Sequence, residues 1–515
     1  MSDFMDWRNA VIYEVWPRSF FDSNHDGSGD IAGLISKLAY FKELGIDVLW
    51  LGPVYQSSWV DAGYDVDDHT AIDPLFGNMQ DLQRLIYLAR QNHLKVMLDM
   101  VVNHTSIRHR WFQESSSSRN NSKADWYIWA DGSRDSPPNN WLSVFGGSAW
   151  EFVPQRQQYY LHTFYKEQPD LNWQNPHLRR AIYDLFRYYL RMGVEGLRID
   201  AASHLAKDPL LCNNPLRSNA KRIHDPYEKQ KHLYDKNLPE RFKYINEMSQ
   251  VLSEFPGTFM FTESYLGLRQ LQQIHGQTSN SNHTAYNFNL IEIPFKPQII
   301  YQSISTYLEI VAKHQAIPNW TLSNHDRQRL VSRVGPMRAR LLAMLQMALP
   351  GIAFIYYGEE IGMSEVHIPA QLRYDRYAYH DRDAQRTPMQ WSNQQYAGFS
   401  DAPPWLPVGD STYQNFATQY ESPSSIWHLY RTLINFKKAT GWQMFETQLN
   451  ATEHILEIDR KGHNEHYRII LNFSTEVVKI LEPLPQTKPV ISTYLDRDNC
   501  DDQKLRPFEG VILSL

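Results

Sequence analysis

The chain has 515 residues, of which 42% are hydrophobic and 21% charged. This length exceeds a single ordinary core and suits one large domain with one or two smaller ones. The net charge of −6 argues against a nucleic-acid or anionic-membrane partner, because such partners call for basic patches.

The sequence lacks closely spaced cysteines, a signal pattern and a membrane span, and these three features predict a protein that works inside the cell. The two cysteines, Cys212 and Cys500, lie far apart without metal-ligand spacing, so we expect free thiols in a reducing compartment. Residues 1–7 are polar and acidic and lack a signal pattern. No run of about 18 apolar residues marks a membrane span. We therefore expect a soluble cytoplasmic protein, either a monomer or a small homo-oligomer.

Short apolar runs alternate with amphipathic stretches over most of the chain. Strands followed by helices indicate βαβ units and a parallel sheet, and about eight such units closing on themselves give a (β/α)8 TIM barrel. A doubly wound open sheet is the alternative, but no Gly-rich phosphate fingerprint follows the first strand. Strands are predicted at 11–15, 48–51, 96–102, 197–199, 259–262, 320–322 and 352–356, and helices at 31–44, 81–91, 179–192, 338–349 and 426–436.

Two irregular stretches interrupt this alternation, and the pattern changes near the C-terminus. Residues 105–174 are rich in Ser, Asn, Asp, Gly and Trp and predict a subdomain inserted after the third strand. The barrel is then expected over 1–104 and 175–438, with an irregular insertion at 364–420. Residues 439–515 predict a C-terminal antiparallel β-sandwich domain with strands at 454–458, 467–471, 477–481, 490–494 and 511–513.

Ionisable side chains stand at the ends of several predicted barrel strands, where such barrels carry their functional groups. A single acidic residue at a strand end is usually a hydrogen-bonded structural carboxylate. Four carboxylates and two histidines facing one pore are instead crowded charges that fold stability disfavours, so they indicate an active site. They are Asp99, His104, Asp200, Glu263, His325 and Asp326, with Arg198 in the fourth strand.

Glycoside hydrolysis needs such a set, because one carboxylate attacks the anomeric carbon and one carboxylic acid protonates the leaving oxygen. Arg198 lies two residues before Asp200, so both side chains point to the same face of the strand. Its guanidinium is expected to keep Asp200 ionised. Glu263 has no cation nearby in the sequence, so we expect it to keep a raised pKa and to act as the acid.

Six sequence blocks in a characteristic order resemble the α-amylase superfamily of glycoside hydrolases. The resemblance covers nearly the whole chain and is strongest to the oligo-1,6-glucosidase and maltase branch. The blocks are GPVY at 52–55, DMVVNH at 99–104, GLRID at 196–200, FTES at 261–264, LSNHD at 322–326 and GIAFIYYG at 351–358.

This resemblance implies a retaining enzyme that cleaves α-glucosidic bonds of small oligosaccharides. It assigns Asp200 as the nucleophile and Glu263 as the general acid/base. Asp326 would bind sugar hydroxyls and stabilise the transition state. The remaining assignments are substrate-binding groups around the first glucose: His104, His325, Tyr64 stacked on the ring, and Arg198, which Asp99 would bond.

Two further blocks are similar to markers of the oligo-1,6-glucosidase branch, QPDLN at 168–172 and RTPMQW at 386–391. The resemblance pairs Asp61 with Arg386, which would wall off the pocket beyond the non-reducing glucose and impose exo action. An ordinary surface salt bridge is the alternative. Ala62 and residues 383–385 depart from the usual pattern of relatives but leave both charged groups in place.

The residue after the expected nucleophile is Ala201. In similar enzymes a Val there accompanies α-1,6 preference, so the small side chain favours maltose-type α-1,4 bonds, although one contact rarely decides specificity. An oligo-1,6-glucosidase and a transferring or isomerising relative, of the trehalose synthase or sucrose isomerase type, remain alternatives. A non-catalytic transporter-accessory relative would carry a membrane helix, and a phosphosugar hydrolase would need a cationic pocket.

A separate acidic loop follows the first strand. Alternating oxygen ligands with glycines resemble the start of a calcium loop, although the Glu of the EF-hand's twelfth position is replaced by Gly33. A polar turn is the simpler interpretation. Related enzymes hold a structural Ca²⁺ or Mg²⁺ here, and no organic cofactor is expected. The implied ligands are the side chains of Asp22, Asn24, Asp26 and Asp30 and the carbonyl of Ser28.

Overall fold

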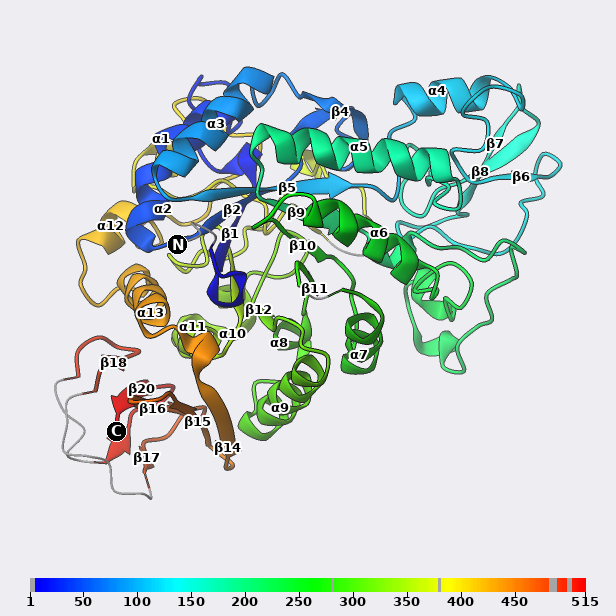
Figure 1. The fold of residues 1–515 in the computed structure, drawn as a ribbon. Coiled ribbons are helices and arrows are strands. Elements are labelled where there is room, and N and C mark those ends of the chain that lie inside the picture. Colours follow the sequence, from blue (N-terminus) through cyan, green and yellow to red (C-terminus); the bar gives the residue numbers. More distant parts are fainter. Residues whose placement is uncertain (1–4, 280, 378–380, 481–488, 498–502) are drawn as a thin grey trace.

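The computed structural model describes residues 5–279, 281–377, 381–480, 489–497 and 503–515, so Cys500 and part of the predicted strand 477–481 lie outside the described residues. Eight parallel strands form one sheet in the order β11-β10-β9-β5-β2-β1-β13-β12 (Figure 1). Their bounds are β1 (Val11–Val15), β2 (Val48–Leu51), β5 (Lys95–Val101), β9 (Gly196–Asp200), β10 (Phe259–Thr262), β11 (His283–Ala285), β12 (Asn319–Thr321) and β13 (Ile352–Tyr356).

Side-chain hydrogen bonds join the two outer strands and bring the sheet close to a closed barrel. Asn319 donates through Nδ2 to the Ala285 carbonyl at 2.8 Å, and its Oδ1 accepts the Asn287 N–H at 2.9 Å. The predicted (β/α)8 barrel is confirmed. The sequence missed β11 because its three residues, His283–Ala285, include no apolar run, although all three are buried.

Helices cover the outside of the barrel. The single helix predicted at 31–44 is wrong: Lys37 has a non-helical backbone and divides it into α1 (Ile31–Ser36) and α2 (Leu38–Leu44). No helix within the described residues is both long and apolar enough to cross a membrane. The others are α3 (Met79–Gln91), α5 (Pro176–Met192), α6 (Arg241–Ser253), α7 (Leu268–Gln277), α8 (Asn289–Glu292), α9 (Pro297–Lys313), α10 (Leu330–Val334), α11 (Pro336–Ala348) and α13 (Ile426–Thr440).

Large apolar side chains fill the barrel interior, as in other barrels of this kind. Trp50, Phe261 and Phe354 are fully buried there, and the Trp50 ring meets the Phe261 ring edge-on at 5.0 Å. These side chains fill the barrel below the carboxyl ends of its strands. The polar groups that end the strands are therefore left to face the space above it.

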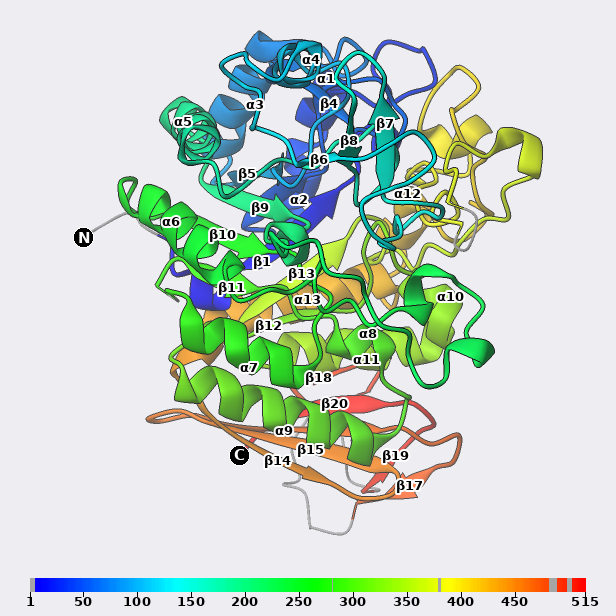
Figure 2. The same ribbon diagram turned by 90° about the vertical axis from the view of Figure 1, so that its right-hand side faces the viewer.

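The inserted subdomain stands over the carboxyl ends of the barrel strands, in the direction of the strand arrowheads (Figure 1). It contains a helix that the sequence did not predict, α4 (Arg110–Ser117), and a three-stranded antiparallel sheet. The strands are β6 (Trp129–Asp131), β7 (Trp150–Val153) and β8 (Gln158–Leu161). The hairpin of β3 (Tyr55–Ser57) and β4 (Val66–Ile72) follows β2, and Figure 2 shows the molecule from the side of the subdomain. The short helix α12 (Phe416–Tyr420) packs against α13 on the outside of the barrel, away from the subdomain (Figure 1).

The C-terminal domain is a five-stranded antiparallel sheet with a two-stranded sheet beside it, which fits the predicted β-sandwich. Alternate residues of the large sheet face opposite ways. Leu456 and Ile469 pack toward the barrel helices, and Ile455 and Ile470 form a small core with Leu505 of the second sheet. The strands are β14 (Glu446–Ala451), β15 (Ile455–Lys461), β16 (His466–Asn472), β20 (Gly510–Ser514) and β18 (Ile491–Ser492), then β17 (Val478–Lys479) and β19 (Lys504–Leu505).

Candidate active site

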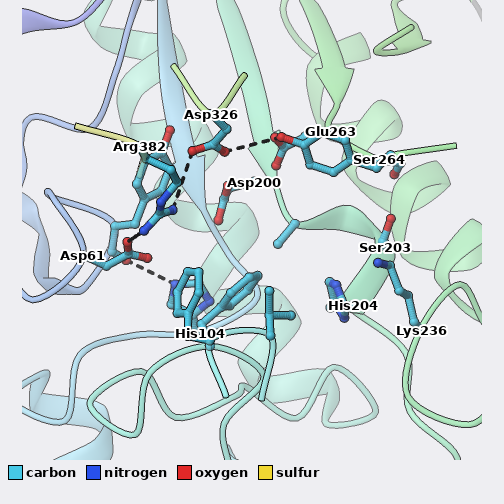
Figure 3. A pocket seen from close by; sticks show the side chains of 16 residues that line it. Asp61, His104, Asp200, Ser203, His204, Lys236, Glu263, Ser264, Asp326 and Arg382 are labelled. Atoms are coloured by element: carbon cyan, nitrogen blue, oxygen red, sulfur yellow. Dashed lines mark hydrogen bonds and ion pairs between the residues drawn. The ribbon is translucent and has the colours of Figure 1, made fainter. Parts of the chain in front are cut away.

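The carboxyl ends of the barrel strands open into a cavity of about 650 Å³, counted with its open mouth, which is a usual size for a small-molecule site. Figure 3 shows side chains from the barrel, the inserted subdomain and residues 364–420 converging on it. Six of the predicted site residues line the cavity: Asp61, Tyr64, His104, Asp200, Glu263 and Asp326. Arg198, His325 and Arg386 lie directly behind them, bonded to the lining groups.

Arg198 is the electrostatic centre of the site and is almost fully buried. Its Nη1 lies 2.8 Å from Asp200 Oδ1 and 2.6 Å from Asp99 Oδ1, so the expected contact with Asp99 is confirmed. Its Nη2 lies 2.7 Å from Glu263 Oε2. Glu263 has no cation near it in the sequence, but the fold supplies one, because β10 pairs with β9 in a register that sets Phe261 beside Arg198, two residues before Glu263.

The sharing of one guanidinium changes the expected electrostatics of Asp200. Burial raises the pKa of the Asp200 carboxyl, Arg198 opposes this shift, and repulsion from Glu263 and Asp99 adds to it. The sequence predicted that Arg198 keeps Asp200 ionised, but one guanidinium cannot fully balance three carboxylates. The Asp200 carboxyl is therefore harder to ionise than the sequence predicted.

Asp326 lies among three cations. Its Oδ1 is 2.7 Å from Arg386 Nη2 and 3.6 Å from Arg382 Nη1, and its Oδ2 is 3.4 Å from His325 Nε2. Burial works against ionisation, but His325 and the two arginines outweigh it and hold the pKa of Asp326 well below its usual value. Asp326 is therefore a carboxylate at neutral pH.

His325 is held between two carboxylates. Its Nδ1 hydrogen-bonds Glu14, and its ring stacks on those of Trp16 and Tyr64. Burial disfavours the charged imidazolium, but Asp326 and Glu14 outweigh burial and raise the pKa of His325 to about 10. His325 is thus a cation at neutral pH, placed to orient Asp326. Nothing in the sequence of β1 marked Glu14 as its partner.

This shift predicts an alkaline loss of stability. Because the pKa of His325 is raised from 6.5 to about 10 on folding, its contribution is complete below pH 6.5 and is lost as the pH rises through 10. Within that window the free energy of unfolding should fall by up to about 1.4 kcal/mol per pH unit. We expect the melting temperature to drop between pH 7 and 9.5 and to drop less in His325→Gln. An equal drop in both proteins would contradict the assignment.

The partner predicted for Asp61 is wrong. Asp61 Oδ1 lies 2.8 Å from Nη2 of Arg382, whereas Arg386, four residues later, bonds Asp326 and the His325 carbonyl. Both arginines belong to an irregular segment without helical or strand periodicity, so their spacing in the sequence could not show which one reaches Asp61. Arg382 is therefore a site residue that the sequence did not single out.

Further residues of the site come from the inserted subdomain and were also missed. Gln168 donates through Nε2 to Asp61 Oδ2 at 3.0 Å, and the same nitrogen lies 3.1 Å from Nε2 of His104. The QPDLN block carried this signal without assigning a contact. Phe145 and Phe164 supply apolar walls, and no sequence pattern marked either residue.

The predicted metal loop is separate from the cavity. Asp22 accepts three backbone N–H groups of the loop, Asp26 accepts the Ser28 N–H at 2.8 Å, and Asp30 accepts an N–H of the first turn of α1 at 2.6 Å. In the described part of the chain, no three His, Cys, Asp or Glu side chains gather as a metal group. The oxygen-only donors, with Asn24, still fit a hard cation, since ionised carboxylates keep free lone pairs. The ion stays a prediction.

Comparison with known proteins decides the family. The model of the alpha-amylase catalytic domain matches residues 14–445, which include every barrel strand from β2 onward and all the carboxylates described above. The chain belongs to the alpha-amylase family.

Relatives of this alpha-amylase family protein cover it almost from end to end. It is 38% identical to the probable alpha-glucosidase of Rhizobium meliloti (strain 1021), over 96% of this chain and 94% of that protein. It is 34% identical to the oligo-1,6-glucosidase of Parageobacillus thermoglucosidasius, over 99% of each. The crystal structure of the alpha-glucosyl transfer enzyme XgtA superposes with a TM-score of 0.90 at 34% identity, covering 99% of each chain.

Proposed function

We propose that the protein is a retaining, exo-acting α-glucosidase that releases glucose from the non-reducing end of short α-glucosides. The observation that carries this proposal is the convergence of Asp200, Glu263 and Asp326 on one cavity, with Arg198 bonded to the first two. Two carboxyl groups within reach of one guanidinium suit the short separation, about 5 Å, of retaining enzymes. The names of the relatives agree with this activity.

In this mechanism Asp200 attacks the anomeric carbon while the Glu263 carboxylic acid gives its proton to the glycosidic oxygen, which leaves with the aglycone. The resulting glucosyl ester on Asp200 is hydrolysed when Glu263, now a carboxylate, takes a proton from water that attacks the same carbon. Two inversions give retention. Asp326, fixed as an anion beside His325, binds sugar hydroxyls and stabilises positive charge on the ring in both transition states.

In this proposal the enzyme cleaves only at the chain end because the groups around Asp61 close one end of the cavity. Arg382 bonds Asp61, and its guanidinium also lies 4.8 Å from the centre of the Phe145 ring. Gln168 bonds the other Asp61 oxygen. A chain that extends beyond the first glucose would have to displace this paired group, which is costly for buried charges. Only the non-reducing terminal glucose is then admitted.

Ala201 supports a preference for α-1,4 bonds. It lines the cavity next to Asp200 and has a left-handed backbone, with φ 54° and ψ 35°. A β-branched residue is strained there, by about 1–2 kcal/mol, and would also narrow the aglycone side. We expect Ala201→Val to lower the melting temperature and to shift the maltose-to-isomaltose ratio of kcat/KM toward isomaltose by about tenfold. Ala201→Gly is the control, and an unchanged ratio in Ala201→Val would refute the argument.

A product time-course on maltose, isomaltose, sucrose and trehalose tests the proposed function. Glucose released from maltose faster than from isomaltose supports it. Faster release from isomaltose would instead identify an oligo-1,6-glucosidase. New oligosaccharides or isomerised disaccharides in place of glucose would identify a transferring enzyme, the alternative that likeness to XgtA favours.

We further propose that the loop of Asp22, Asn24, Asp26, Ser28 and Asp30 binds a structural Ca²⁺ or Mg²⁺. The support is its oxygen-only donor set and its position between β1 and α1. A bound ion stabilises the folded state by mass action, by about 2.7 kcal/mol at a hundredfold excess over Kd. The melting temperature should therefore fall on chelation and recover with Ca²⁺, and Asp26→Ala should abolish the response. A melting temperature indifferent to chelator would refute the site.

We also propose that the enzyme acts in the cytoplasm on small oligosaccharides, as a monomer or small homo-oligomer. The low cysteine content supports the reducing compartment. A cavity that admits one terminal glucose supports short oligosaccharides as substrates. Cell fractionation and light scattering of the purified protein test the two parts separately.

A further inference from the structure

Lys236 lies at the end of the cavity opposite Asp61 and Arg382. Figure 3 shows those two residues on one side of the three carboxylates, and Lys236 with Ser203 on the other. If the non-reducing glucose lies beside Asp61, as the proposed function has it, the leaving group must lie on the Lys236 side. Lys236 also lines the two adjoining cavities through which this end reaches the surface.

The Lys236 ammonium has no polar partner within the described residues. Within the described residues it makes no hydrogen bond or ion pair, and its one assigned contact is with the face of the Tyr227 ring, 5.6 Å from its centre. Burial lowers its pKa, while Glu228 and Asp235 oppose that shift. An ammonium has three donors and is costly to desolvate without partners. The position thus leaves three donors for a ligand.

The neighbouring charges are already paired. Asp235 bonds His232 at 2.9 Å, and Glu228 lies 3.6 Å from Arg217. On the far wall Arg327 lies 3.1 Å from Glu292. The carboxylates Glu228, Asp235 and Glu292 equal the cations Arg217, Arg327 and Lys236 in number, so these groups leave no net positive charge for an anionic leaving group such as a phosphosugar. A neutral group rich in hydroxyls is the chemistry that suits one free ammonium among aromatic rings.

The backbone fixes Lys236 relative to the proposed nucleophile. The Asn237 N–H donates to the Ser203 carbonyl at 2.7 Å, and Ser203 belongs to the 3-10 turn that follows Asp200. A second bond, from Asp208 to the Tyr234 carbonyl at 2.8 Å, holds the same segment. The backbone at Lys236 is therefore held by the turn that follows Asp200, which suits a residue that binds the leaving sugar.

We propose that Lys236 is a specificity-determining residue that donates hydrogen bonds to hydroxyls of the aglycone. The inference rests on the proposed α-glucosidase function and names its leaving-group site. Lys236 then favours α-glucosides whose leaving group is a second sugar over those whose leaving group has no hydroxyls. By microscopic reversibility it also favours sugar acceptors over water when the glucosyl-enzyme is resolved.

The test compares maltose with p-nitrophenyl α-glucoside, whose leaving group carries no sugar hydroxyls. In Lys236→Met we expect kcat/KM for maltose to fall about tenfold or more, as for the loss of a hydrogen bond to a charged group, and kcat/KM for the aryl glucoside to change less than about threefold. Lys231→Met, an exposed lysine of the same segment outside the three cavities, is the matched control and should change neither.

A second measurement uses the aryl glucoside as donor and added glucose as acceptor. Lys236→Met should make less disaccharide per glucose released than the wild type, while Lys236→Arg keeps part of the transfer because it keeps the charge. Equal losses on maltose and the aryl glucoside would overturn the inference, because they would place Lys236 at the glucose or the acid. If the wild type cleaves neither substrate, the proposed function itself fails. Melting curves of each variant separate these outcomes from misfolding.

Discussion

Asp200→Ala is expected to abolish turnover of every α-glucoside while the protein stays folded. Without the Asp200 carboxylate no glucosyl ester forms, and loss of a catalytic nucleophile typically costs about 10⁴-fold or more in kcat. Asp200 lies at the carboxyl end of β9 and bonds Arg198, which keeps two other carboxylate partners in the variant. The remaining site is therefore not left with an unpaired buried cation.

Thermal unfolding makes this prediction specific to catalysis. Since burial and the neighbouring carboxylates raise the pKa of Asp200, its ionised form is unfavourable in the folded protein. The melting temperature of Asp200→Ala should equal or exceed that of the wild type. Asp131→Ala, at an exposed residue of β6, serves as the control with full activity. Retained turnover by well-folded Asp200→Ala would sink the proposed mechanism.

Glu263→Gln is expected to lower kcat/KM for maltose by about 10³-fold, within the range for loss of a general acid. An activated aryl glucoside, whose leaving group needs no protonation, should lose far less in the first step. Its glucosyl-enzyme should then accumulate, because no base remains to activate water. The measurement is a burst of p-nitrophenol followed by a slow steady state.

Azide distinguishes the role of Glu263 from that of Asp200. Azide needs no general base, so it should rescue Glu263→Gln on the aryl substrate and give the α-glucosyl azide, with retained configuration. Rescue of Asp200→Ala by direct attack would give the β-azide instead. A β-azide from Glu263→Gln would reverse the two assignments, and equal losses on maltose and the aryl glucoside would remove Glu263 from the acid's role.

The sequence determined the barrel and the positions from which its chemistry is built. Alternation of apolar strands with amphipathic helices depends on local periodicity, which survives without knowledge of contacts. The two-residue spacing of Arg198 and Asp200 fixed their common direction because side chains alternate along a strand. Strand-end carboxylates could be recognised for the same reason. The three-residue β11 (His283–Ala285) escaped because it has no such pattern.

Only the tertiary structure decided which groups share a partner. Pairing of β9 with β10 brings Arg198 to Glu263, and no sequence spacing relates those strands. Arg382 rather than Arg386 reaches Asp61 because an irregular segment folds back over the cavity. Only the structure shows that the charged neighbours of Lys236 have partners while, among the described residues, the Lys236 ammonium has no hydrogen bond or ion pair. Periodicity reports the direction of a side chain along its own element, whereas charge sharing depends on distances between elements, which chain folding alone sets.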